Sequence, residues 1–317
     1  MRFVIAVMAI GGMLVFGNAT LHAQSQAWQP IPESQRCPSK WGAGDQRGSA
    51  NWMKPETVLR AAKLIRTGET IELSFVLSSA MPLIGDRRFD LITRYTGRTQ
   101  KPNATGGLTE AVFSDIGQVG TQIDSFAHQM IGGTFYNCFK LDDIATPNGL
   151  TKLGVENFGT LMTRGVVLDI AALKGVDMLG EAYMITPEDL QQALAREKLS
   201  LQPGDAVLIH TGWGKLYGKD NTRYLRSSPG IGLQAVQWLI GQDPMLIGAD
   251  NCCVEVRPVG VGPLLHPYIV AQNGMILVEN IKLDEVTAKS LYEFAFIIEP
   301  LKIQGGTGST IAPVAIH

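Results

Sequence analysis

The spacing of apolar side chains predicts helices and strands that alternate along the chain. Between residues 55 and 67 the apolar positions recur every three or four residues, which indicates an amphipathic helix that ends at Gly68. Between residues 70 and 77 apolar and polar positions alternate, as they do in a half-buried strand. Apolar runs predict further strands within 165–171, 204–213, 245–249, 274–279 and 291–303, and a helix within 233–240. No break in composition divides these elements, so we expect one mixed α/β domain over residues 41–317.

Three segments carry more specific local signals. Thr186 is expected to cap a helix, because Pro187 suits the first turn and the Asp189 carboxylate can return the hydrogen bond. Residues 80–108 carry mixed charge, prolines and glycines, and we expect a long functional loop or hairpin there. Residues 305–309 are rich in glycine but lack the lysine of a phosphate-binding loop, so we expect a turn that closes the sheet.

Residues 1–23 have the parts of a secretory signal peptide. Arg2 precedes an apolar run from Phe3 to Phe16, which is shorter than the roughly twenty residues that span a bilayer. We expect cleavage near Ala23, export to the periplasm or secretion, and no stable membrane anchor afterwards. An uncleaved anchor is the alternative. Residues 24–40 are polar and rich in proline, and are expected to form an N-terminal arm.

Charge and cysteine content restrict the function further. The 317 residues include 27 Lys plus Arg and 29 Asp plus Glu, a balance that argues against nucleic-acid binding. The four cysteines permit disulfides in an oxidising compartment, but their spacing is not that of a disulfide framework. Cys252 and Cys253 are neighbours, and neighbouring cysteines rarely pair because the ring is strained. No C-x-x-C is present, which excludes a zinc ribbon or a redox motif of that type.

Polar side chains within residues 115–128 are the strongest candidates for a site. Gln118, Gln122, Asp124 and His128 are separated by even numbers of residues, so an extended backbone would direct them to one face. An edge strand with a polar face would show the same spacing. Spacing alone does not distinguish the two.

This segment resembles the signature of the cyclase-like metal-dependent hydrolases, the family of bacterial kynurenine formamidase and isatin hydrolase. The family pattern is His-x-Gly-Thr-His-x-Asp-x-Pro-x-His. The positions that match it are Gly120, Thr121, Asp124 and His128. Gln118 and Gln122 stand where the pattern has its first two histidines, and Phe126 replaces the proline. A Thr-Gln-x-Asp form is associated with a branch of longer bacterial members. The resemblance implies an α/β fold, a swivelling β/β/α domain with a mixed sheet.

The resemblance also implies a metal site. A second family segment, a His followed about a dozen residues later by Glu-Asn, is similar to His266 and Glu279. In members with two ions, one ion is held mainly by the histidines that Gln118 and Gln122 replace, and an amide is a weaker ligand than an imidazole. The residues equivalent to the ligands of the other ion are Asp124, His128, His266 and Glu279. We therefore expect one divalent ion, Mn²⁺ or Zn²⁺. Alternatively Gln122 ligates through its oxygen, and His128 is free to act as a base.

Hydrolysis of an amide-type C–N bond by a metal-activated water is the implied reaction, with a lactam or an N-formyl aryl amide as the substrate. His128 is the candidate base, and Thr211 could donate to the oxyanion together with Gln118 or Gln122. Four aromatic residues are candidates for a small cyclic or aromatic substrate: Trp41, Phe126, Tyr136 and Trp213. Each of them could equally be an ordinary core residue. Asp250 and Glu255 are candidates for a supporting role, with surface or capping roles as the alternative.

The sequence also permits two other functions, and the family resemblance implies an assembly. The glutamines could mark a periplasmic binding protein that has lost a metal site, and Cys252 or Cys253 could belong to a Cys-dependent amidase. A Gly-x-Ser-x-Gly nucleophile elbow is absent from the sequence, which argues against a serine hydrolase. Family members commonly form dimers or tetramers through an N-terminal arm. The resemblance therefore implies a homodimer or homotetramer, with the arm that carries Trp28 and Trp41 reaching a neighbour.

Overall fold

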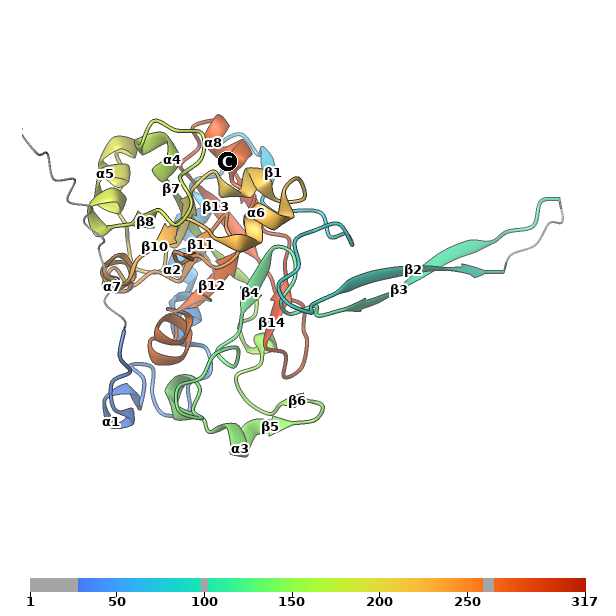
Figure 1. Cartoon of the computed structure of the whole chain (residues 1–317), viewed down its shortest axis with the longest axis horizontal. Helices are drawn as coiled ribbons and strands as arrows, with labels where there is room; N and C mark the ends of the chain where they lie inside the picture. Colours follow the sequence, from blue (N-terminus) through green and yellow to red (C-terminus); the bar gives the residue numbers. More distant parts are fainter. Residues whose placement is uncertain (1–27, 98–101, 259–264) are drawn as a thin grey trace, which may run out of the picture.

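A mixed β-sheet forms the centre of the molecule, in a computed structural model that describes residues 28–97, 102–258 and 265–317 (Figure 1). Within the described residues this sheet has nine strands, in the order β1-β15-β13-β7-β9-β11-β12-β4-β14. Their bounds are β1 Thr70–Glu72, β4 Gln122–Asp124, β7 Leu161–Asp169, β9 Ala206–His210, β11 Leu246–Ala249, β12 Ile276–Glu279, β13 Glu293–Ile298, β14 Gly308–Thr310 and β15 Val314–Ile316. Strands β7, β9, β11 and β12 run parallel, and the strands on either side of them pair antiparallel. The predicted α/β class with a mixed sheet is confirmed.

The parallel strands form where the sequence is apolar almost without interruption. Every residue of β9, β11 and β12 is buried, as is every residue of β7 except Met162. Parallel strands need cover on both faces, and the helices supply part of it. Helix α2 packs on β7 and β13, and α5 packs on β7, α4 and α7. The helices are α1 Glu33–Arg36, α2 Pro55–Ala62, α3 Leu141–Ile144, α4 Ile170–Leu173, α5 Pro187–Glu197, α6 Asn221–Arg226, α7 Leu233–Ile240 and α8 Asp284–Ala288.

Local signals in the sequence locate the helix starts well. The Thr186 side chain accepts the Asp189 N–H, and the Asp189 carboxylate accepts the Thr186 N–H, so the predicted capping box begins α5. Helix α7 has the bounds that the apolar spacing predicts. Helix α2 begins at Pro55 as expected but ends at Ala62, before the predicted stop at Gly68.

Two predicted strands are longer in the sequence pattern than in the structure. The strand expected over 70–77 is regular only in β1, because the N–H of Phe75 donates to the Thr121 hydroxyl instead of a strand partner. The strand expected over 204–213 ends at His210, because Gly212 has a φ of 76° and begins a short 3-10 helix, η4 (Trp213–Leu216). The first of these strands therefore ends beside Thr121, within the polar segment that follows residue 115.

A long β-hairpin projects from the body of the molecule (Figure 1). Strand β2 (Phe89–Thr96) pairs with β3 (Gly107–Ser114) over its whole length. The predicted loop or hairpin within 80–108 is therefore a hairpin, and it extends to Ser114. At its root the Arg88 N–H donates to the Asp115 carboxylate, at 2.8 Å. The hairpin therefore ends directly before the signature segment, and the residue that precedes its first strand is bonded to Asp115.

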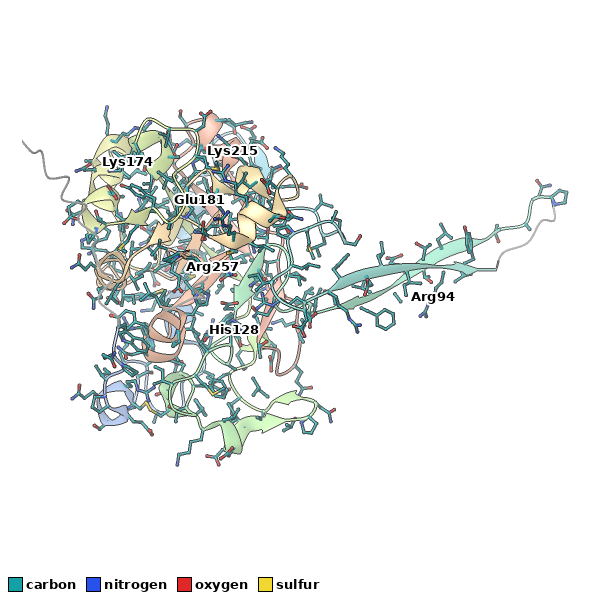
Figure 2. All side chains as sticks on the ribbon, viewed as in Figure 1. Arg94, His128, Lys174, Glu181, Lys215 and Arg257 are labelled. Carbon is teal, nitrogen blue, oxygen red and sulfur yellow. A yellow bond between two sulfur atoms is a disulfide. The ribbon has the colours of Figure 1, made fainter. Side chains whose placement is uncertain are left out.

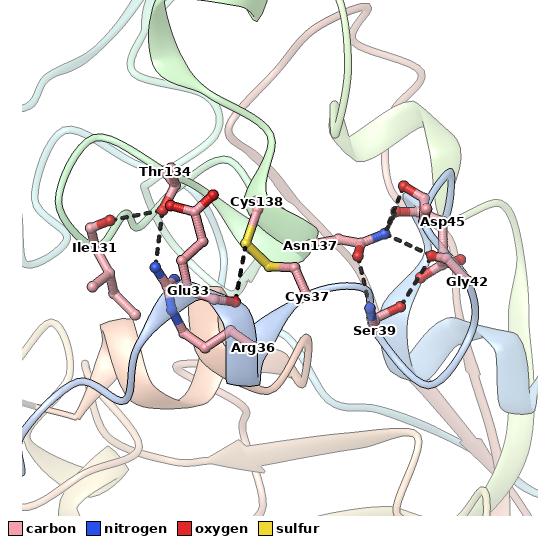
Figure 3. The surroundings of a disulfide bond; sticks show 11 residues. Glu33, Arg36, Cys37, Ser39, Gly42, Asp45, Ile131, Thr134, Asn137 and Cys138 are labelled. Carbon is pink, nitrogen blue, oxygen red and sulfur yellow. Dashed lines mark hydrogen bonds between the residues drawn. A yellow bond between two sulfur atoms is a disulfide. The ribbon is translucent and has the colours of Figure 1, made fainter.

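The N-terminal arm is attached to its own chain in the described residues. Cys37 forms a disulfide with Cys138, which the cysteine spacing did not predict (Figure 3). The Ser39 N–H donates to the Asn137 side chain at 2.8 Å, and Trp28 packs edge-on against Tyr268. The expected signal peptide lies outside the described residues.

Small sheets and one wide helix complete the fold. Strand β8 (Met184–Ile185) pairs with β10 (Gly230–Ile231), and β5 (Ala145–Thr146) pairs with β6 (Gly149–Leu150). A π-helix, η5 (Pro267–Gln272), begins directly after His266. In the ranges that the structure describes, no helix combines the length and the apolar character needed to cross a membrane.

Candidate metal centre and active site

Three buried side chains from different segments meet at one end of the sheet. Asp124 ends β4, Glu279 ends β12, and His266 precedes η5. Strands β4 and β12 are antiparallel neighbours, with Glu279 opposite Gln122, so the pairing brings the first two segments together. One ligand atom from each of Asp124, His266 and Glu279 lies within 4.8 Å of the other two. Such a cluster of carboxylate oxygen and imidazole nitrogen has the donors that Mn²⁺ or Zn²⁺ prefers.

The Asp124 carboxylate fits a cation better than it fits its protein neighbours. Its Oδ2 atom is buried and accepts no hydrogen bond from any described residue. That atom lies 3.8 Å from His266 Nε2 and 4.0 Å from His128 Nε2. A buried carboxylate oxygen without a partner is costly, and binding a cation removes that cost. The geometry therefore fits a divalent ion.

A third buried carboxylate orients His266. Glu255 Oε2 lies 3.3 Å from His266 Nδ1 and accepts the N–H of Leu265 at 2.7 Å. The opposite ring atom, Nε2, lies 2.9 Å from Glu279 Oε1. A carboxylate on the far nitrogen of a metal-binding histidine fixes the ring and its tautomer. Of the two possible supporting residues, Glu255 therefore contacts the cluster.

The charge of the cluster is set by burial and by close carboxylates. Burial raises the pKa of Glu279 to about 8, with a further contribution from the nearby Asp124 carboxylate. Burial alone would lower the pKa of His266, but the carboxylates of Glu255 and Glu279 outweigh it and raise that pKa well above its ordinary value. Burial also lowers the pKa of His128, although Asp124 opposes the change. The two raised pKa values thus reflect acidic groups buried close together, an arrangement that a bound cation would stabilise.

The two signature glutamines connect the carboxylates. Gln118 Nε2 donates to Asp124 Oδ1 at 3.2 Å, while Gln122 Nε2 donates to Glu279 Oε2 at 2.9 Å and to Gln118 Oε1 at 3.2 Å. The two glutamines meet although only Gln122–Asp124 is extended, because residues 117–121 form turns and bends. The residues between them turn elsewhere: Val119 and Ile123 enter the apolar core, and Thr121 donates to the backbone of Asn280. In this orientation Gln122 directs its amide nitrogen toward Glu279 as a hydrogen-bond donor. The lone pair of that nitrogen is delocalised into the amide, so it is not available to a metal.

His128 lies in the loop after β4 (Figure 2). Its side chain is 17% exposed, whereas the side chain of Asp124 is fully buried. His128 is thus the member of the set that solvent reaches. Thr211 is not brought to the cluster, because its hydroxyl and its N–H both bond to Asp250 Oδ1, at 2.5 and 3.0 Å.

Each of the four aromatic candidates has packing or hydrogen-bond partners of its own. Phe126 is fully buried against Tyr136, whose hydroxyl donates to Asp45 at 2.7 Å. Trp213 is fully buried and donates to the backbone of Tyr224. Trp41 packs edge-on against Trp52, and the adjacent Lys40 pairs with Asp243, just before β11 begins. Trp41 therefore lies toward the amino ends of the parallel strands, opposite the end that carries Glu279.

A small recess of about 10 Å³, room for about one water molecule, lies beside the cluster. Its lining residues are Pro82, Ile84, Arg87, Gln118, Val119, Gly120, Gln122, Tyr224, Leu225, Cys252, Glu279 and Asn280. Sequence reasoning missed Arg87 and Tyr224, since each belongs to a segment without a motif of its own, whereas Asn280 is the Asn of the Glu-Asn pair in the second family segment. Asn280 directly follows Glu279, and its amide donates to Gly120 O at 2.8 Å, which fixes the signature turn. Arg87 donates to Gln118 O at 3.0 Å.

A larger hollow of about 210 Å³ lies elsewhere, beside Tyr292 and the C-terminal His317. It includes Glu197, whose pKa burial raises to about 7. Glu197 accepts the N–H of Asp169, and the described lining residues bring no histidine or carboxylate cluster comparable to that at Asp124. The candidate metal-binding residues therefore lie at the smaller recess and not at this hollow.

Known proteins resemble this chain in sequence and in fold. The family model described as "Putative cyclase" matches residues 71–256, which is more than half of the chain. The chain belongs to this cyclase family. A solved structure described as a novel cyclase is 32% identical, with a TM-score of 0.81 over 88% of this chain and 98% of that one. No curated protein matches the chain.

More distant structures share the cyclase fold. Isatin hydrolase A from Ralstonia solanacearum is 22% identical, with a TM-score of 0.56 over 78% of this chain and 91% of that one. An isatin hydrolase bound to the product analogue thioisatinate is 18% identical, with a TM-score of 0.56 over 83% and 98% of the two chains. At these identities the similarity extends to the fold alone. The family resemblance of the signature segment is thus confirmed, while its assignment to the longer branch stays a prediction.

Proposed function

We propose that this cyclase-family protein is a metal-dependent hydrolase with one divalent ion, Mn²⁺ or Zn²⁺, per chain. The observation that carries the proposal is the buried cluster of Asp124, His266 and Glu279, in which Asp124 Oδ2 has no hydrogen-bond partner among the described residues. His128 completes the set from the solvent side. When bound there, a divalent ion lowers the pKa of a water toward about 7 and polarises a carbonyl group.

The protein's own groups have separate tasks in this reaction. His128 is the exposed imidazole beside Asp124, and it can exchange a proton between the reacting water and solvent. The Gln118 and Gln122 amides line the recess, and their N–H groups hold the Asp124 and Glu279 carboxylates in place. Thr211 does not reach this position, so we assign it to supporting Asp250.

The substrate that fits best is a small cyclic or aromatic molecule with an amide-type C–N bond, such as a lactam or an N-formyl aryl amide. Apolar side chains such as Ile84 and Val119 form part of the wall of the recess, as they do in most small-molecule sites. Arg87 is the one Lys or Arg among its described lining residues, and it suits the carboxylate that amide or lactam hydrolysis releases. Isatin hydrolases, whose fold this chain shares, support the choice of a C–N bond.

The test is a panel of lactams, N-formyl aryl amines and lactones, assayed with metal-loaded wild type and His128→Ala. We expect turnover of at least one amide-type compound, loss of turnover on chelation, and a reduction of roughly 10²- to 10⁴-fold in His128→Ala. Turnover that survives both changes would refute the mechanism. Turnover of lactones alone would refute the choice of an amide.

A binding protein without catalysis is the alternative, and the Gln122 bond to Glu279 favours it, because that bond partly satisfies the carboxylate without an ion. This alternative predicts tight binding of a panel compound that is never turned over, with or without added metal. A Cys-dependent amidase predicts that alkylation abolishes activity while bound metal is retained.

We also propose export and self-association. A disulfide between Cys37 and Cys138 suits an oxidising compartment, which supports cleavage of residues 1–23 and a periplasmic or secreted protein. The projecting hairpin supports a homodimer or homotetramer, because a two-stranded ribbon with exposed apolar residues is marginally stable alone. Since the described arm packs on its own chain, the hairpin is the better candidate for reaching a neighbour.

A further inference from the structure

The two cysteines that the disulfide leaves over lie against each other in the wall of the recess. The sulfur atoms of Cys252 and Cys253 are 2.8 Å apart, and both residues are buried. Non-bonded heavy atoms usually approach to about 3.5–4.0 Å, and a disulfide bond is about 2.05 Å long. The two thiols are therefore in direct contact.

The backbone around the pair is held in a strained turn. The Asn251 side chain accepts the N–H of Cys253 at 3.2 Å and that of Val254 at 2.6 Å, and its amide donates to Pro229 O. The Glu255 N–H donates to Cys253 O at 2.6 Å, which closes a three-residue γ-turn. Val254 lies at its centre with a φ of 60°, an unfavourable value for a β-branched residue. Strain of this kind persists only where surrounding contacts impose it, and it gathers at functional sites.

Neighbouring contacts keep the turn from relaxing. The Ile231 N–H donates to Val254 O at 3.1 Å, and Gly230 approaches so closely that a Cβ there would lie 2.3 Å from the Glu255 carbonyl carbon. On the other side, the Arg257 guanidinium donates to the Cys252 sulfur at 3.7 Å. The pKa of Cys252 is lowered to about 7, first of all by the hydrogen bond with Cys253. A cation beside one sulfur makes that sulfur the better nucleophile.

We propose that Cys252 and Cys253 form a reversible disulfide between neighbouring residues in the wall of the recess. A low-molecular-weight disulfide, such as oxidised glutathione, is the oxidant. The Cys252 thiolate attacks one of its sulfurs and releases one thiol, giving a mixed disulfide. The Cys253 sulfur then attacks Cys252 and releases the second thiol. One S–S bond forms in the protein and one breaks in the oxidant, while two protons and two electrons pass to the two released thiols.

Two consequences follow for the site. In the disulfide form no thiol faces Gln122 and Glu279 across the recess, so Cys252 can act neither as a nucleophile nor as a competing metal ligand. Reduction restores both capacities. Neighbouring Cα atoms are about 3.8 Å apart, less than the roughly 4.4 Å minimum of an ordinary disulfide. The ring is therefore strained and reduces more easily than the bond between Cys37 and Cys138, whose Cα atoms are 6.0 Å apart.

The test is a thiol map of the whole protein after incubation with oxidised glutathione. The protein is denatured and alkylated without reductant, and the peptide that contains residues 252 and 253 is weighed by mass spectrometry. We expect it to carry no alkyl group and to be two hydrogens lighter than the dithiol, and to gain two alkyl groups after dithiothreitol. In graded glutathione buffers it should open while Cys37–Cys138 stays closed. Two alkylated cysteines at 252 and 253, or a stable glutathione adduct on Cys252, would overturn the proposal.

Two variants complete the test. Cys253→Ser removes the second step, so we expect a glutathione adduct on Cys252 in place of the ring; an unmodified Cys252 would contradict the proposed order of attack. The double variant Cys37→Ser, Cys138→Ser is the matched control and should keep the ring. A missing ring in this control would show that the pair forms only by exchange with the other disulfide, and the proposal would fail.

Discussion

Two side chains of the signature separate this chain from the family pattern. Gln118 and Gln122 replace the histidines of that pattern, yet they stay beside the carboxylates, connected to Asp124 and Glu279 by hydrogen bonds. We therefore expect the residue type at these two positions, rather than the backbone geometry, to limit the number of bound ions.

We predict that restoring both histidines adds an ion. Wild type, purified without an affinity tag, should bind about one Mn²⁺ or Zn²⁺ per chain, and the double variant Gln118→His, Gln122→His about two, because imidazole is the stronger ligand. Metal analysis by mass spectrometry after dialysis measures both. The single variant Gln118→Asn serves as a control with unchanged stoichiometry. Wild type that binds no metal would contradict the site, and a double variant that stays at one ion would contradict the role of the glutamines.

Glu255 offers a second test at the scale of one residue. Because its carboxylate lies against the far nitrogen of His266, Glu255→Gln should weaken metal binding roughly 10- to 100-fold without removing a ligand. Titration of the metal-free protein, followed by calorimetry, gives the affinity. Glu197→Gln is a matched control, since Glu197 is also a buried glutamate that accepts a backbone N–H. Equal affinity in both variants would show that Glu255 does not position His266.

The sequence indicated the ligand types but not all of their neighbours. Asp124, Glu279 and the glutamines were predictable because a motif fixes their spacing within one strand or one strand end. His266 and Glu255 meet only because a turn and a π-helix fold their segments together, and no local pattern encodes that contact. Thr211 is a residue whose contacts the motif did not predict. It follows β9 at the edge of the sheet that carries Glu279, but its hydroxyl donates to Asp250.

At the scale of elements, the parallel strands place charged groups along one edge. Asp169, His210 and Glu279 end β7, β9 and β12, and Asp250 directly follows β11. His210 Nδ1 lies 2.8 Å from Asp169, and its Nε2 lies 3.8 Å from Asp250 and 3.9 Å from Asp284. Burial alone would lower the pKa of His210, but these carboxylates raise it to about 10.

We predict that this histidine makes the protein less stable at alkaline pH. Its pKa is about 10 when folded and about 6.5 when unfolded, so its contribution is complete below the lower value and is lost as pH rises through the higher one. Between these values the free energy of unfolding should fall by up to about 1.4 kcal/mol per pH unit from this group. His210→Gln should remove that slope, as measured by urea unfolding from pH 7 to 10. Asp169→Asn should reduce it. Parallel pH profiles for wild type and His210→Gln would contradict the assignment.

Elements with strong periodicity were predictable, and those set by tertiary contacts were not. Helix α5 has a complete cap in its own sequence, and β11 and β12 are short apolar runs that only a buried strand explains. Strand β4 has only three residues, and its place between β12 and β14 depends on partners more than 150 residues away in sequence. The disulfide of Cys37 depends on the same kind of long-range approach.

At the scale of the whole molecule, the hairpin of β2 and β3 projects away from the core (Figure 1). Leu91 lies opposite Val112, and Tyr95 lies opposite Leu108, so four large apolar side chains share one face of the ribbon. They are between 47% and 65% exposed. The other face carries Arg94 (Figure 2) and Asp90 beside two exposed apolar side chains, Ile92 and Phe113, while Glu110 lies between the apolar pairs of the first face. An apolar strip of this kind on a projecting ribbon indicates an interface.

We predict that the strip joins copies of this chain. Light scattering at micromolar concentration should give the mass of a homodimer or homotetramer for wild type, and the melting temperature should rise with protein concentration. The double variant Leu91→Lys, Leu108→Lys places two charges on the apolar face and should give a monomer. Thr109→Lys adds a charge on the opposite face and should leave the assembly intact. A monomeric wild type would contradict self-association, while a double variant that keeps the wild-type mass would move the interface away from the hairpin.

Because Asp115 anchors the hairpin root just before Gln118, the monomeric variant should also bind its metal more weakly than Thr109→Lys does.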